Sequence, residues 1–155
     1  MQDNELRDYW PKNFSTKVYD DLPKHIALAA GEIDRCLQAG APRAAAAMTR
    51  TLVEAVAKDH NITKGNLQSK IEALAAAGLI GQELKEAVHE IRFLGNEAAH
   101  ADFDGPPITM SEAQESAEWT DLLLDRIYQE PARVARLLAR RAQRRASGGG
   151  TPAPG

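Results

Sequence analysis

Apolar residues recur every three or four positions through most of the chain, which is the spacing of amphipathic helices. The pattern runs from residue 23 to residue 130. Glycine, proline and polar clusters interrupt it at four places, namely residues 38–42, 60–65, 78–81 and 101–110. We therefore expect an all-α fold, an antiparallel helical bundle of four to five core helices that is followed by a basic C-terminal helix.

Local signals indicate where several of these helices begin or end. Pro23 suits the first turn of the first helix. Gly78 and Gly81 bracket two apolar residues, as expected for a tight joint between antiparallel helices. Ser111 and Gln114 have the spacing of a capping box, so the fifth helix is predicted to begin there.

The same pattern divides the chain into four parts. Residues 1–22 place aromatic side chains among charges without a sustained period, and we expect an irregular arm that packs these rings on the core. Residues 23–130 form the bundle, and residues 131–146 form the basic helix. Residues 147–155 are predicted to be a flexible tail, because their Gly, Pro and Ser content offers nothing to bury.

The helix predicted around residues 85–100 sorts its side chains onto two faces. The apolar face comprises Leu84, Ala87, Val88, Ile91, Leu94, Gly95, Ala98 and Ala99. The polar strip, about 80° wide, comprises Lys85, His89, Arg92, Asn96 and His100. Because ionisable groups also cluster for structural reasons, the strip is either a functional site or a solvated or dimer-contact face.

Two further groups of polar residues could support this strip. Arg50 and Glu54 are four residues apart, the spacing at which opposite charges meet across a helical turn, and structural pairing is the favoured interpretation. Asp102 and Asp104 follow the strip in a loop. They could orient His100 or bind a basic partner, although aspartates in loops are ordinarily turn formers.

Composition narrows the possible functions. The chain has 155 residues, and its hydrophobic content of 43% is sufficient for one packed domain. No apolar run approaches the roughly 20 residues that span a bilayer, and the first residues lack the features of a signal peptide, so we expect a cytoplasmic protein without a membrane segment. The single Cys36 is interpreted as a core residue. Without paired cysteines or an H-E-x-x-H arrangement, we expect no metal and no cofactor.

The net charge of −3 hides an asymmetry. Residues 131–146 carry +6 without an acidic residue, which leaves −9 on the remainder. Val134, Leu137 and Leu138 of this segment still have an apolar face to bury. Its arginines could bind phosphates by releasing counterions, or they could solubilise a helix end. The candidate nucleic-acid contacts are Lys85, Arg133, Arg136, Arg140 and Arg141.

The run I-R-F-L-G-N-E-A-A-H, preceded by R-T-L-V-E and L-P-K-H-I, resembles the HEPN-like domains, named for higher eukaryotes and prokaryotes nucleotide-binding. More narrowly, it is similar to the branch of unknown function that occurs alone or fused to restriction and other defence proteins. The resemblance covers about residues 22–131. It implies an all-α bundle that dimerises with the polar strips of two subunits facing each other, and active members of the superfamily are metal-independent ribonucleases.

The resemblance also implies roles for individual residues. His100 would act as acid or base on the ribose 2′-hydroxyl, Arg92 would hold the phosphate, and Asn96 would orient the reacting groups. The supporting residues would be Arg50, Glu54 and His89. The HEPN motif has arginine directly before the polar residue, where this chain has Gly95. Arg92 and His100 are about 12 Å apart along a helix, but an antiparallel dimer could bring them together across its interface.

These observations predict a homodimeric domain that engages RNA or a nucleotide. The more specific hypothesis is a metal-independent ribonuclease of phage defence or of a toxin–antitoxin system. The alternative is a catalytically inactive module for dimerisation or protein interaction within a defence complex. A third hypothesis makes the basic C-terminal helix a nucleic-acid tether.

Overall fold

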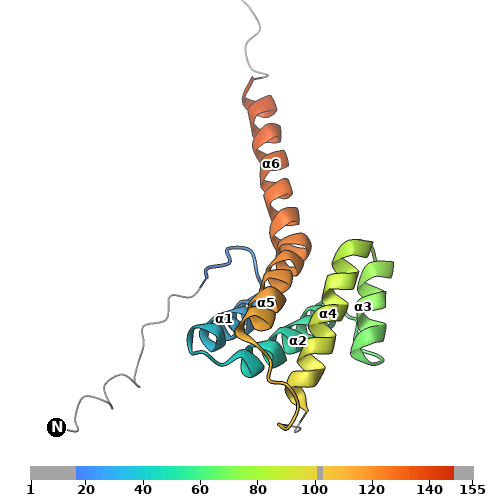
Figure 1. The fold of residues 1–155 in the computed structure, drawn as a ribbon. Coiled ribbons are helices and arrows are strands. Elements are labelled where there is room, and N and C mark those ends of the chain that lie inside the picture. The colour runs from blue at the N-terminus through green and yellow to red at the C-terminus, as the bar shows by residue number, and fades with distance from the viewer. Residues whose placement is uncertain (1–16, 101–102, 149–155) are drawn as a thin grey trace, which may run out of the picture.

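The computed structural model describes residues 17–100 and 103–148, and all regular secondary structure in these ranges is helical. The elements are α1 (Lys24–Gln38), α2 (Pro42–Asp59), α3 (Leu67–Ala76), α4 (Gln82–Ala99), α5 (Met110–Leu124), the π-helical turn η2 (Asp125–Gln129) and α6 (Glu130–Gly148). Helices α1 to α5 pack into one bundle, and α6 projects from it (Figure 1). The expected all-α bundle is therefore confirmed, with five packed helices.

Helix α2 lies at the centre of the bundle, where it contacts α1, α3, α4 and α5. Its small residues Ala45 and Ala46 are fully buried and allow the neighbouring helices to approach closely. Its larger residues Leu52, Val53 and Val56 are fully buried as well. Burial of each such side chain stabilises the fold by about 1.5–3 kcal/mol, so α2 anchors the core.

Helix α4 crosses α2 at Gly95. A Cβ atom added to this glycine would collide with the Cβ of Arg50 and would lie 3.1 Å from the carbonyl oxygen of Ala46. The crossing therefore requires glycine on α4, and it brings the polar side chains of the two helices together. The predicted apolar face of α4 is otherwise confirmed at Val88 and Ile91, whereas Ala99 is exposed.

The N-terminus of α5 differs from the prediction. The capping box consists of Thr109 and Glu112, not of Ser111 and Gln114. The Thr109 hydroxyl accepts a hydrogen bond from the Glu112 backbone N–H at 3.2 Å, and the Glu112 carboxylate accepts one from the Thr109 N–H at 2.8 Å. Both pairs have the same spacing, but the buried Ile108 anchors the chain directly before Thr109. At the α3–α4 joint, Gly78 has a positive φ of 71° and Ile80, which lies between the two glycines, is buried.

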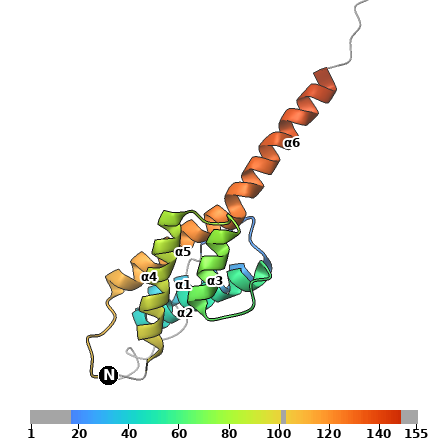
Figure 2. The same cartoon turned by 90° about the vertical axis from the view of Figure 1, so that its right-hand side faces the viewer.

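The end of the bundle also differs from the prediction. Pro131 does not interrupt the helix, because η2 joins α5 to α6 without a break. A π turn is wider than an α turn, and here it lies where the proline ring would otherwise clash with the carbonyl of Ile127. Helix α6 begins one residue before the predicted start and extends to Gly148, within the predicted tail. Figure 2 shows α6 continuing away from the bundle.

The apolar residues of α6 are not buried, contrary to the prediction. Val134, Leu137 and Leu138 are 49%, 59% and 62% exposed. The reason is that α6 extends past the end of the bundle, where none of the other described helices lies beside it.

Part of the N-terminal arm is described by the structure. Tyr19 and Leu22 pack against the core, as expected for the arm. The other arm aromatics, Tyr9, Trp10 and Phe14, lie outside the described residues. None of the helices in residues 17–100 and 103–148 is long and apolar enough to cross a membrane.

Candidate functional site

The N-terminal half of the polar strip is bound to α3. The Nζ of Lys85 lies 3.1 Å from one carboxylate oxygen of Glu72, and the Nε2 of His89 lies 3.0 Å from the other. The hydrogen bond with His89, followed by that with Lys85, lowers the pKa of Glu72. Lys85 was predicted to contact nucleic acid, but the structure places it in an ion pair that fastens α4 to α3.

The C-terminal half of the strip is bound to α2. The Nε of Arg50 donates a hydrogen bond of 2.8 Å to the Oδ1 of Asn96. A second guanidinium nitrogen of Arg50 lies 3.8 Å from Glu54, so the predicted pair forms, and Lys70 approaches the same carboxylate at 4.0 Å. Arg50 was predicted only to support the strip, yet it makes the direct contact with it. Because Gly95 has no side chain, α2 comes close enough for this arginine to lie beside Asn96.

Arg92 lies one turn before Asn96 and stacks on an aromatic ring. Its guanidinium carbon is 4.1 Å from the ring centroid of Phe93, which is 50% exposed. Within the described residues, the buried Nε of Arg92 has no hydrogen-bond partner, and neither has the buried Nδ1 of His89. Leaving such buried atoms unpaired has an energetic cost.

His100 ends α4 instead of continuing the polar strip along the helix. Its backbone is extended, with ψ of 139°, and its N–H donates to the carbonyls of Asn96 and Glu97 at 3.2 Å each. The side chain is exposed. Asp102, a predicted partner of His100, lies outside the described residues.

Arg43 stabilises the same end of α4. One guanidinium nitrogen donates to the carbonyls of Ala98 at 3.1 Å and of His100 at 3.0 Å. These carbonyls form the negative end of the helix dipole, so a cation here is favourable. The guanidinium also stacks on Phe103, 4.7 Å from the ring centroid.

Sequence reasoning missed Arg43, Phe93 and Phe103. Phe93 could have been found from the sequence, because it is an aromatic residue directly after Arg92 of the polar strip. No sequence signal connects Arg43 with Phe103, because these residues are 60 positions apart and meet only through the packing of α2 against α4.

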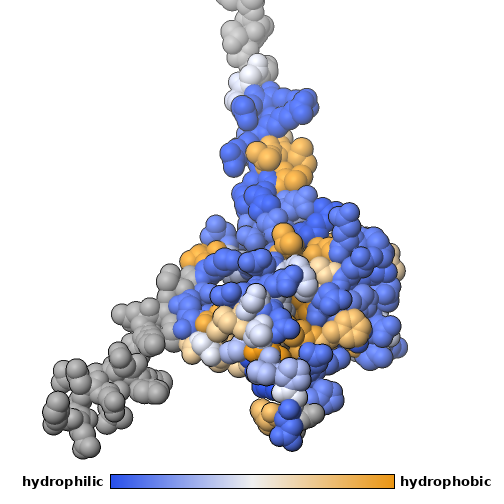
Figure 3. Space-filling view, viewed as in Figure 1, coloured by the Kyte–Doolittle hydropathy of each residue, from blue (hydrophilic) through white to orange (hydrophobic). Residues whose placement is uncertain are grey.

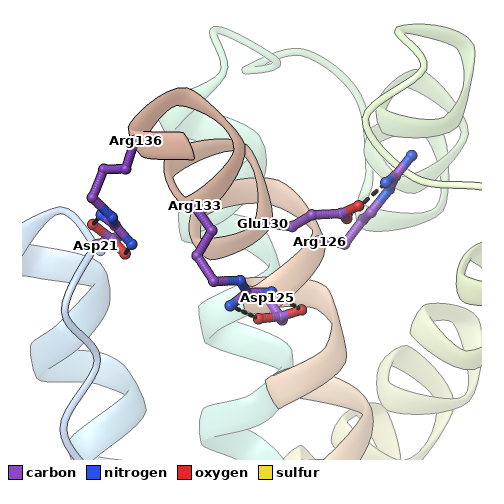
Figure 4. A network of polar contacts seen from close by, with 6 residues as sticks. All are labelled: Asp21, Asp125, Arg126, Glu130, Arg133 and Arg136. Carbon is purple, nitrogen blue, oxygen red and sulfur yellow. Dashed lines mark hydrogen bonds and ion pairs between the residues drawn. The ribbon is translucent and has the colours of Figure 1, made fainter. Parts of the chain in front are cut away.

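The arginines of α6 fall into two groups. Arg133 makes a bidentate contact with Asp125 at 2.8 and 3.1 Å, and Arg136 makes one with Asp21 at 2.6 and 3.0 Å (Figure 4). Each arginine lowers the pKa of its aspartate, chiefly through the hydrogen bonds. The arginines without an acidic partner among the described residues are Arg140, Arg141, Arg144 and Arg145. Four arginines of α6 are predicted to contact nucleic acid, and two of them are thus already paired with carboxylates.

The structure therefore gathers a smaller group than the predicted strip. Arg50, Arg92, Phe93 and Asn96 surround the C-terminal half of α4, and His100 lies at its end; we call these five residues the α4 cluster. A row of exposed acids runs along α4 next to it, made of Glu86, Glu90 and Glu97. The described residues contain no group of three or more His, Cys, Asp or Glu side chains arranged to hold a metal ion.

The α4 cluster lies within a region that matches a known family. A family model described as Domain of unknown function (DUF4145) matches residues 31–140. No curated protein and no solved structure matches the chain. The matched region contains α2 to α5 and covers more than two thirds of the 155 residues, so the chain belongs to the DUF4145 family.

Proposed function

We propose that this protein is a HEPN-like domain that engages single-stranded RNA or a nucleotide at the α4 cluster, without a metal ion. The observation that carries the proposal is the hydrogen bond from Arg50 to Asn96, with Arg92 stacked on the exposed Phe93 one turn away. Two guanidinium groups supply charge for phosphate, and the ring supplies a surface for base stacking. The similarity of residues 91–100 to HEPN domains supports the same site.

The proposal also accounts for Gly95. In the HEPN motif the arginine precedes the polar residue on one helix, whereas here Arg50 reaches Asn96 from α2. The glycine makes this approach possible, because a side chain at position 95 would collide with Arg50. We infer that Arg50 takes the part that the motif gives to the missing arginine.

The more specific part of the proposal is that the α4 cluster cleaves RNA. His100 would take the proton from the ribose 2′-hydroxyl, whose oxygen would attack the adjacent phosphorus and displace the 5′-oxygen of the next nucleotide. The leaving 5′-oxygen would take a proton from water, and the products would be a 2′,3′-cyclic phosphate and a 5′-hydroxyl. Arg50 with Arg92 would stabilise the charge that develops on the phosphorane. The protein would act as a homodimer in the cytoplasm, in phage defence or in a toxin–antitoxin system, as the resemblance implies.

Binding is tested by fluorescence anisotropy with labelled single-stranded RNA in the presence of EDTA at low salt. We expect Phe93→Ala to weaken binding about 5- to 160-fold, because stacking of one base contributes about 1–3 kcal/mol. Arg92→Ala should also weaken binding, because it removes a charge that would contact phosphate. Arg35→Ala removes one exposed charge from α1, far from the cluster in sequence, and should leave binding nearly unchanged. Absence of binding by the unmodified protein would refute the proposal.

Cleavage is tested with the same RNA on denaturing gels. His100→Ala should retain binding and lose cleavage, since its side chain is exposed and the substitution disturbs no core contact. If both proteins produce the same background of fragments, the protein binds RNA without cutting it.

The acidic row on α4 favours a second candidate function, a non-catalytic protein-interaction module. Glu86, Glu90 and Glu97 are exposed beside the cluster and would repel phosphates. In this case the row would bind a basic partner within a defence complex. The anisotropy experiment separates the two candidates: replacing the three glutamates by glutamine should tighten RNA binding under the first proposal, and under the second no RNA binding would be seen with either protein.

A further inference from the structure

One stripe of α6 has an ordered sequence of charges. Glu130, Val134, Leu138, Arg141 and Arg145 are spaced four, four, three and four residues apart and lie within about 80° of one another around the helix. The stripe is acidic at the base of α6, apolar in its middle and basic at its tip. Glu130 accepts a hydrogen bond of 2.7 Å from Arg126 through one carboxylate oxygen, which leaves its other oxygen for a second partner (Figure 4). Figure 3 shows a hydrophobic patch interrupting the hydrophilic surface of this helix.

The apolar middle of the stripe has no partner in the described part of the chain. Val134, Leu137 and Leu138 are about half exposed or more, and α6 has no buried residue. Most helices in proteins are stabilised by the packing of an apolar face, and α6 projects from the bundle without such packing.

We propose that a second copy of this chain covers the stripe, with the two α6 helices antiparallel and a two-fold axis near Leu137. Val134 and Leu138 of one protomer then pack against the same residues of the other. Residues 130 and 144 both lie seven positions from Leu137, about 10 Å along the helix in opposite directions. Arg141 and Arg145 therefore come to either side of the Glu130 of the partner subunit.

The order of charges selects this arrangement over a parallel one. In an antiparallel pair the basic tip of each helix meets the acidic base of the other, whereas a parallel pair would align arginine with arginine. The base also borders a groove of about 740 Å³, whose floor includes Leu84, Trp119 and Leu122. Glu130 belongs to both the stripe and the groove, so the tip of the partner's helix would reach the mouth of this groove.

Charge placement also argues against a lipid surface as the occupant. A helix that lies on a membrane keeps its charges on the face opposite its apolar side chains. In α6, Arg141 and Arg145 continue the apolar stripe itself, while Arg133 and Arg136 are held by Asp125 and Asp21 (Figure 4). The proposed interface is separate from the α4 cluster and does not depend on RNA binding. It is a different contact from the one that the HEPN resemblance places between the polar strips of two subunits.

The first test is sedimentation of the full chain. The unmodified protein should form a dimer, and Leu138→Glu should raise the dimer dissociation constant at least about 10-fold, as expected for a residue at the centre of an interface. Leu28→Glu is a matched control, since Leu28 on α1 is 58% exposed and Leu138 is 62% exposed. Because α6 buries no residue and the side chain of Leu28 is exposed, circular dichroism should show that both variants are folded.

The second test is the orientation of the helices, with Cys36→Ser as the background. Leu137→Cys should form a disulfide between protomers, because the residue lies near the two-fold axis. Arg145→Cys should not, because the two copies of residue 145 would lie about 24 Å apart. Disulfide formation by both variants would indicate a parallel pair and overturn the proposal. The proposal would also be overturned if the unmodified chain were a monomer, or if Leu138→Glu left the dimer unaffected. If the monomer then bound RNA or anionic vesicles through α6, that ligand would be the partner of the apolar stripe.

Discussion

Gly95 decides how closely two helices approach. It is buried at the crossing of α4 and α2, where the backbone carbonyl of Ala46 and the side chain of Arg50 leave no room for a methyl group. The interaction of Arg50 with Asn96 depends on this crossing, since the two residues belong to different helices. A single absent side chain thus controls both packing and the composition of the α4 cluster.

Gly95→Ala is expected to lower the free energy of unfolding by about 1–3 kcal/mol, as is usual when a methyl group is forced into a well-packed core. Urea denaturation measures this change. Gly31→Ala is the control, because its added Cβ would meet only the end of the Arg35 side chain at 3.3 Å, and alanine stabilises a helix by up to about 1 kcal/mol relative to glycine. Equal stability of Gly95→Ala and the unmodified protein would show that α2 and α4 can separate without cost.

Helix termini show how local and tertiary information combine. Thr109 and Glu112 satisfy the first backbone donors of α5 through reciprocal hydrogen bonds. Ser111 and Gln114 offer the same spacing two residues later, but Ser111 lies inside the helix. The preceding residue, Ile108, is buried and thereby selects between two equivalent local signals.

Thr109→Ala should destabilise the protein by about 1 kcal/mol through loss of the N-cap hydrogen bond. Thermal or urea unfolding would detect this change. Ser111→Ala serves as the comparison, because alanine is a better helix former than serine and this substitution should be neutral or slightly stabilising. If Ser111→Ala destabilised the protein more than Thr109→Ala, the N-cap would be Ser111 instead.

Across the whole molecule, acidic side chains join separate elements. Among residues 17–100 and 103–148, the carboxyl groups whose pKa is lowered are Asp21, Glu72, Glu112 and Asp125. Two of them connect distant segments, since Glu72 joins α3 to α4 and Asp21 joins the chain before α1 to α6. Their ionisation is therefore coupled to the integrity of the fold.

This coupling predicts the response to acid. A carboxyl group with a lowered pKa in the folded state stabilises the protein fully above its unfolded pKa, about 4, and this stabilisation is lost as the pH falls through the folded pKa. We therefore expect the urea midpoint to decrease from pH 6 to pH 3. Glu72→Gln should lower the midpoint at pH 6 and make its pH dependence shallower. A midpoint that rises on acidification would contradict the role of these pairs.

The limits of sequence-based prediction are visible at particular residues. The Arg50–Glu54 pair was predictable because both residues are on one helix. The contact between Arg50 and Asn96 was not, because the residues are 46 positions apart and meet only when α2 and α4 cross. For the same reason, the binding of Lys85 and His89 by Glu72 could not be foreseen from a helical projection.

By itself, the sequence determined the helices, their approximate ends and the all-α bundle, because apolar periodicity and helix-breaking residues act locally. It also determined that Lys85, His89, Arg92 and Asn96 lie on one line of α4. Only the tertiary structure decided which of these groups are paired, since pairing depends on the angle and distance at which helices cross. It likewise decided that the apolar stripe of α6 remains uncovered, because burial depends on whether another helix lies beside it.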